Sequence, residues 1–94
     1  MPSMAVVRKA MVWTAHVLRD PTGSWMPLGD FLFNWHALTG AAFDASRVGV
    51  STAMEFMDRL ADVKLIEIDR TLGRSVRVRL HPDAYDLFLW PTHA

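Results

Sequence analysis

The chain has 94 residues, of which 51% are hydrophobic, so it can bury the core of one small domain, and we expect a single domain over residues 1–94. It contains no cysteine, which excludes disulfides, thiolate metal sites and thiol nucleophiles. Ten basic and ten acidic side chains cancel. The chain therefore lacks the basic surplus that usually accompanies nucleic-acid binding, which remains compatible with the sequence only if the charges are separated in space.

The amino-terminal segment lacks the features of a targeting or membrane segment. The stretch from Met1 to Leu18 includes Arg8, Lys9 and His16, and these side chains fit neither the apolar part of a signal peptide nor a bilayer span. The lack of cysteine fits a reducing compartment. We therefore expect a soluble cytoplasmic protein that does not contact a membrane.

Helical spacing of apolar residues predicts a first helix from Ser3 to Arg19. Two apolar stripes run side by side along this helix. The first stripe consists of Met4, Val7, Met11, Ala15 and Leu18, and the second consists of Val6, Ala10, Trp13 and Val17. Two stripes indicate that the helix is buried on two sides or packs against another chain.

Turn residues interrupt the helical pattern after the first helix. Residues 20–23, Asp-Pro-Thr-Gly, predict a turn, and residues 24–27 predict a short edge strand because the proline at its end cannot donate to a ladder. A second helix is predicted from Leu28 or Gly29 up to a cap at Gly40. Its apolar stripe consists of Phe31, Leu32, Trp35 and Leu38.

A third helix is predicted over residues 52 to about 61. Its apolar face consists of Val50, Ala53, Met57 and Leu60. The threonine at its start and Glu55 have the spacing of a capping box. The preceding residues 41–48 show no clear pattern, although Asp44 and Ser46 are both suitable helix N-caps.

The period then changes from helical to alternating. Residues 65–70 and 75–80 both alternate between apolar and charged side chains, and the four residues between them include a glycine. This pattern predicts a β-hairpin. Pro82 suits the first position of a helix, and we expect a short final helix over residues 84–90.

Four arginines lie in or beside this hairpin, and the pattern separates them into two pairs. Arg77 and Arg79 face outward on the same side as Glu67 and Asp69, which predicts ion pairs across the two strands. The remaining two arginines, Arg70 and Arg74, lie near the tip and have no obvious partner in the sequence. They are the better candidates for contact with a phosphate.

The order helix, short strand, helix, helix, hairpin resembles the winged helix-turn-helix superfamily. The stretch that carries most of the resemblance contains Val50-Ser51, Ala53, Met57, Leu60, Leu65-Ile66 and a hairpin with Arg70, Gly73 and Arg74 near its tip. The resemblance implies an α+β fold with a three-helix core, a C-terminal hairpin wing and a short terminal helix. Two departures are Lys64, where many relatives have glycine, and the long connection from Gly40 to Val50.

The resemblance also implies double-stranded DNA as a partner, with the third helix in the major groove and the wing on the backbone. The candidate DNA-binding residues are Arg47, Ser51, Thr52, Arg59, Arg70 and Arg74. Their side chains can donate to phosphates or base edges. On this reading the chain acts in transcriptional control or a similar DNA transaction, as a dimer.

The third helix argues for the alternative of a module that binds protein and not DNA. It carries Glu55, Asp58 and Asp62, whose charges repel phosphate. Apolar surplus on the first helix and in the carboxyl-terminal tail fits a dimer or partner interface, unless the tail folds back over the core. The candidate interface residues are Met4, Met11, Trp13, Phe88 and Trp90.

The sequence carries no enzyme signature. It has no phosphate-binding loop, no glycine-rich dinucleotide turn and no nucleophile elbow. The histidines His16, His36, His81 and His93 lack metal-ligand spacing. We therefore expect no catalytic residue, no bound metal and no cofactor.

Overall fold

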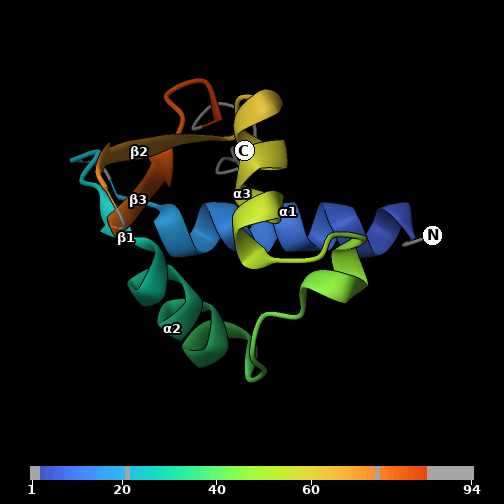
Figure 1. The fold of residues 1–94 in the computed structure, drawn as a ribbon. Coiled ribbons are helices and arrows are strands. Elements are labelled where there is room, and N and C mark those ends of the chain that lie inside the picture. The colour runs from blue at the N-terminus through green and yellow to red at the C-terminus, as the bar shows by residue number, and fades with distance from the viewer. Residues whose placement is uncertain (1–2, 21, 74, 85–94) are drawn as a thin grey trace.

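The computed structural model describes residues 3–20, 22–73 and 75–84. Three α-helices and a three-stranded antiparallel sheet make an α+β fold (Figure 1). The elements are α1 (Met4–Leu18), β1 (Met26–Pro27), α2 (Leu28–Thr39), the short 3-10 helix η1 (Ala45–Val48), α3 (Ala53–Asp62), β2 (Ile66–Leu72) and β3 (Ser75–Leu80). This is the arrangement predicted for a small winged helix. The predicted final helix lies outside the described residues, except for Ala84.

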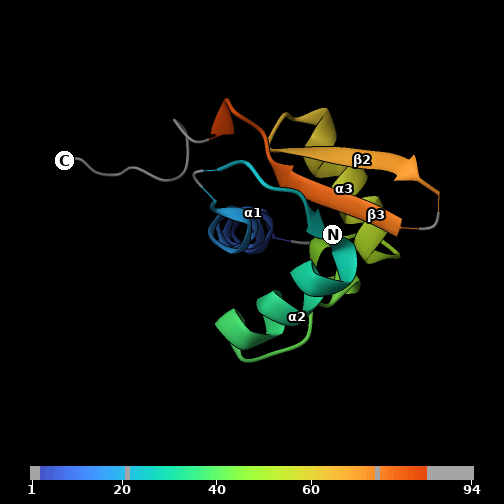
Figure 2. The same ribbon diagram turned by 90° about the vertical axis from the view of Figure 1, so that its left-hand side faces the viewer.

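Helix α1 runs across the molecule in the view of Figure 1 and lies along its left-hand side in Figure 2. Figure 2 looks nearly down its axis, with β2 and β3 above it and α2 below. Ser3 caps its start, because its hydroxyl accepts a hydrogen bond from the amide of Ala5 at 3.0 Å. The buried residues of α1 are Ala10, Thr14, Ala15 and Leu18. The buried face therefore takes residues from both predicted stripes, and Thr14, which belongs to neither, donates to the carbonyl of Ala10 at 2.8 Å.

Helix α2 follows directly from the edge strand β1. Its buried side chains are Phe31 and Trp35, as their spacing predicts. The helix ends at Gly40, whose φ of 82° is a left-handed conformation that glycine adopts without steric cost. In both views α2 lies at the periphery of the molecule, below α1 and the sheet, and it contacts both α1 and the strands β1 and β3 (Figures 1 and 2).

The long connection between α2 and α3 contains η1, which the sequence did not predict. The Asp44 carboxylate caps it by accepting from the Ser46 amide at 3.0 Å. The capping box at the start of α3 is confirmed in a slightly shifted form. The Thr52 hydroxyl accepts from the Glu55 amide at 3.1 Å, and the Glu55 carboxylate accepts from the Ser51 amide at 2.9 Å.

The turn from α3 into the sheet uses a non-glycine residue in a conformation that favours glycine. Lys64 has a φ of 61°, so the turn keeps the left-handed geometry that the resemblance implies despite the different residue. Its amide donates to the Ala61 carbonyl at 3.0 Å, and the Leu65 amide donates to the Leu60 carbonyl at 2.9 Å.

The sheet has the order β1-β3-β2, so the central strand is β3. Ile66 pairs with Leu80 and Ile68 with Val78, which confirms the hairpin and its inward face. The register shifts between Asp69 and Leu72, near the tip. One hydrophobic cluster joins the three helices to this sheet. Of the helices in the described part of the chain, none is long and apolar enough to cross a membrane.

Candidate functional site

The predicted DNA-binding residues at the start of α3 lie together on the surface. Arg47 in η1, Ser51 and Thr52 are all exposed. Their polar groups are partly used by the fold itself, since the Ser51 amide and the Thr52 hydroxyl both bond to Glu55. The Ser51 amide, and after it Arg59, lower the pKa of the Glu55 carboxyl. These contacts keep the negative charge of Glu55 at the start of α3.

The remaining predicted DNA contacts on α3 and the wing are paired with acids. Arg59 Nη2 lies 3.4 Å from Glu55 Oε2, one helical turn away. Arg70 forms an ion pair and hydrogen bond with Asp58 of α3. The prediction that Arg70 has no partner is therefore wrong, because the packing of β2 on α3 brings two residues twelve positions apart into contact. Arg74 lies outside the described residues.

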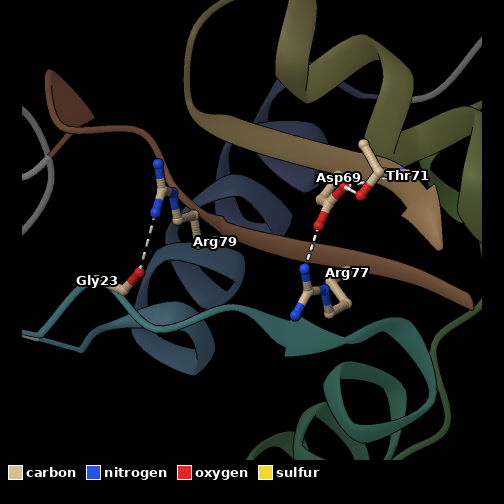
Figure 3. A network of polar contacts seen from close by, with 5 residues as sticks. All are labelled: Gly23, Asp69, Thr71, Arg77 and Arg79. Atoms are coloured by element: carbon tan, nitrogen blue, oxygen red, sulfur yellow. Dashed lines mark hydrogen bonds and ion pairs between the residues drawn. The ribbon is translucent and has the colours of Figure 1, made fainter.

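The outward face of the hairpin confirms the predicted cross-strand pairs. Glu67 stands opposite Arg79 and Asp69 opposite Arg77. Arg79 Nε donates to Glu67 Oε1 at 2.8 Å, and Arg79 Nη1 lies 3.3 Å from the Gly23 carbonyl oxygen. Figure 3 shows the bonds from Arg79 to Gly23 and from Arg77 to Asp69. Both arginines are therefore bonded to groups of the same chain: Arg77 to Asp69, and Arg79 to Glu67 and Gly23.

Asp69 is the most strongly perturbed carboxylate in the described residues. The side chain and then the backbone amide of Thr71 donate to it, followed by the Arg77 guanidinium (Figure 3). Together these groups lower the pKa of Asp69 from 3.8 to about 2. The acid is therefore ionised at all physiological pH values and stays available to Arg77.

The ring of Trp25 contacts the same two arginines. Sequence reasoning missed this contact. The guanidinium carbon of Arg79 lies 4.1 Å from the centre of the Trp25 ring, and that of Arg77 lies 5.8 Å away. Both distances fall within the range of cation–π contacts. No sequence signal predicted this contact, since Trp25 lies more than fifty positions from either arginine.

The surface of α3 and the wing is thus close to charge-balanced. Arg59, Arg70, Arg77 and Arg79 each have an acidic partner. Within the described residues, Arg47 and Lys64 are exposed cations beside α3 for which no ion pair is present. Among the described residues of this surface, the unpaired cations do not form a continuous strip.

The predicted interface residues that the structure describes all lie on α1 and differ in their exposure. Met4 is 73% exposed at the start of α1, whereas Met11 and Trp13 are half-buried and pack against the core. Trp13 lines a cavity together with Arg47, so the structure joins two residues that were predicted for different sites. Phe88 and Trp90 lie outside the described residues.

The outward face of α2 is the largest departure from the sequence prediction. Phe33 is 73% exposed there, and Leu38, a member of the predicted apolar stripe near the end of the helix, is 47% exposed. Gly29 and Ala37, one helical turn on either side of Phe33, are also exposed. Phe33 is the one aromatic residue of this segment outside the predicted stripe, and this position was the sequence signal that could have predicted its exposure. We call Gly29, Phe33 and Ala37 the α2 stripe.

Comparisons with protein-family models, with curated proteins and with solved structures find no match to this chain. Among the described residues, no group of three or more histidine and acidic side chains is placed to hold a metal ion.

Proposed function

We propose that this chain is a winged-helix interaction module that binds another protein through the outward face of α2. The observation that carries the proposal is Phe33, a full aromatic side chain that is 73% exposed in the middle of a regular helix. Aromatic residues are enriched at protein interfaces because they bury a large area with few rotatable bonds. Contact with a partner removes this ring from water.

The surroundings of Phe33 define the chemistry of the partner. Gly29 and Ala37 have almost no side chain, so the ring stands above a flat helix surface. Such a surface fits a groove on a partner that accepts one aromatic ring as an anchor. Asp30 is the only acidic side chain of α2, and the helix has no lysine or arginine. A cationic residue at the rim of the partner groove matches this charge.

The charge arrangement on the other side of the molecule supports a protein partner over DNA. Non-specific DNA affinity comes from cations that neutralise phosphates. Here Arg59 and Arg70 already have acids beside them, and Asp62 adds a further negative charge to α3. The proposal places this module in the cytoplasm, as a subunit or adaptor without a catalytic step.

The test compares two polar substitutions at exposed apolar positions on different elements, α2 and β2. Phe33→Gln changes the α2 stripe, and Leu72→Gln changes the wing, where Leu72 is 53% exposed. Tagged wild type and both variants are expressed in the cells that produce the protein, and the co-purifying chains are quantified by mass spectrometry. Both variants should keep the wild-type free energy of unfolding to within about 0.5 kcal/mol, since neither side chain is buried.

The expected result is a protein, or a second untagged copy of this chain, that accompanies wild type and Leu72→Gln. Phe33→Gln should retain at most about a tenth of it, a loss of about 1.4 kcal/mol in binding. If every co-purifying protein is retained equally by Phe33→Gln, the proposal is wrong.

DNA binding is the second candidate, favoured by one observation. Arg47, Ser51 and Thr52 are exposed at the amino-terminal end of α3, the end at which winged helices approach the groove. Fluorescence anisotropy with a random-sequence duplex at about 50 and 200 mM salt tests it. Salt-sensitive binding that is weakened by Arg47→Ala and Lys64→Ala supports DNA as the partner, and no binding at the lower salt concentration removes this candidate.

A further inference from the structure

A cavity of about 460 Å³ lies between α1, the carboxyl end of α2 and the connection that leads through η1. Cavities of about 300–1,000 Å³ are typical of small-molecule sites. Three aromatic residues from three different segments line it: Trp13 from α1, Trp35 from α2 and Phe43 from the connection. It is separate from the α2 stripe, because Trp35 lies on the buried side of α2 and Phe33 on the exposed side.

The aromatic lining residues Trp35 and Phe43 are fixed in place by packing against other residues of the core. Trp35 is only 8% exposed, and its ring meets Phe43 edge to face, with 5.2 Å between the ring centres and an angle of 87°. On its other side Phe43 packs against Phe56 of α3, also at 5.2 Å. Side chains fixed in this way offer a preformed apolar wall to a flat ring.

The polar part of the lining is positively charged overall. Lys9 and Arg47 both line the cavity and are exposed. Two hydrogen bonds from Ser46, and after them the nearby charge of Arg47, lower the pKa of the Asp44 carboxyl. Asp44 is the one carboxylate among the lining residues. It is already used as the cap of η1, accepting from the Ser46 amide at 3.0 Å and the Ser46 hydroxyl at 2.7 Å. The lining carries two cations against one carboxylate, and this net positive charge favours an anion.

We propose that this cavity binds a small planar aromatic carboxylate. Its ring packs against Trp13 and Trp35, and its carboxylate lies at the rim between Lys9 and Arg47. The ligand is complementary to the lining, because its apolar ring packs on the aromatic wall and its carboxylate pairs with the cations. A ligand here contacts Phe43, and through it lies one side chain away from α3.

The test uses 2-naphthoate as the probe and 2-naphthamide as its neutral counterpart of nearly equal shape. Binding to the full chain is followed by NMR through the indole N–H signals of Trp13 and Trp35, assigned with Trp→Phe variants. Trp25 serves as the internal control, because its ring lies under Arg79 and is not part of the cavity lining. The variants are Lys9→Gln with Arg47→Gln, and Arg8→Gln as a matched control.

The expected result is saturable movement of the Trp13 and Trp35 signals with 2-naphthoate, with the Trp25 signal unchanged. The Kd should rise about tenfold or more in the Lys9→Gln, Arg47→Gln double variant and stay at the wild-type value in Arg8→Gln. The Kd for 2-naphthamide should be the same in wild type and double variant.

Three results overturn the proposal. The first is the absence of any movement of the Trp13 and Trp35 signals up to about 5 mM 2-naphthoate. The second is an unchanged Kd in the double variant, which removes the role of the two cations. The third is movement of the Trp25 signal alone, which places the probe elsewhere. None of these outcomes bears on the α2 stripe, so this proposal and the proposed function fail independently.

Discussion

The surface of α3 and the hairpin differs from the outward face of α2 in whether its exposed side chains have partners within the chain. On α3 and the wing, the arginines Arg59, Arg70, Arg77 and Arg79 are each paired with an acid of the same chain. On the outward face of α2, Phe33 is 73% exposed. The described arginines of the first surface are paired within the fold, whereas under the proposed function the second surface is covered by a partner.

This difference shows that residue type alone does not identify a binding surface. A cluster of arginines beside a predicted recognition helix points to phosphate, yet exposed ion pairs of about 0.2–1 kcal/mol each already occupy these side chains. Binding DNA would require exchanging those partners. An exposed aromatic ring gives up no ion pair when a partner covers it, so under the proposed function Phe33 is the stronger indication of a partner.

The largest expected effect separates two phenylalanines of the same helix. Phe31 is fully buried and Phe33 is 73% exposed. Phe31→Ala should lower the free energy of unfolding by about 3–5 kcal/mol, because it leaves a cavity in the core. Phe33→Ala should change it by no more than about 0.5 kcal/mol. Urea unfolding measures both, and an equally large loss for Phe33→Ala would mean that this ring is part of the fold.

A smaller effect is expected where Trp25 supports the paired arginines of the wing. A double-mutant cycle with Trp25→Leu and Arg79→Met should give a coupling energy of about 0.5–1 kcal/mol, since the guanidinium lies 4.1 Å from the ring centre. The same cycle with Arg59→Met is the control and should give no coupling. Coupling below about 0.3 kcal/mol for Arg79 would show that the wing arginine is not held by this ring.

Acid should weaken the wing through Asp69. The folded state lowers the pKa of this group from 3.8 to about 2, so the unfolded chain binds the proton more readily between these values. The stabilisation is present above about pH 4 and is lost as the pH falls through 2. Asp69→Asn should flatten the fall in the urea midpoint between pH 4 and pH 2. Asp62→Asn controls for the lost charge, and equal slopes in both variants would contradict the account.

The smallest expected change in the free energy of unfolding concerns the turn between α3 and β2. Lys64 has a φ of 61°, which is unfavourable for a side chain with a Cβ. Lys64→Gly should raise the free energy of unfolding by about 0.5 kcal/mol, the relief of strain less the greater chain entropy of glycine. Asp62→Gly at the end of α3 should instead lower it by a similar amount. A loss of stability in Lys64→Gly would mean that the turn is unstrained.

Local patterns predicted the three α-helices, the edge strand and the hairpin with its pairing, but not η1. Helical spacing placed α1, α2 and α3, and strict alternation fixed Glu67 opposite Arg79, because strand register depends on neighbouring residues. The angle at which β2 packs on α3 decides the partner of Arg70, and no local pattern encodes it. For the same reason the position of Trp25 under Arg79 and the cavity beside Trp13 appeared only in three dimensions.

The most direct test of the central claim is site-specific photo-crosslinking at one position on each surface. A photoreactive phenylalanine analogue replaces Phe33 in one variant and Leu72 in another, and both are irradiated in the cells that produce the protein. The account predicts a discrete protein adduct from position 33 that is absent from position 72. An adduct from position 72 only, or none from position 33, would contradict it.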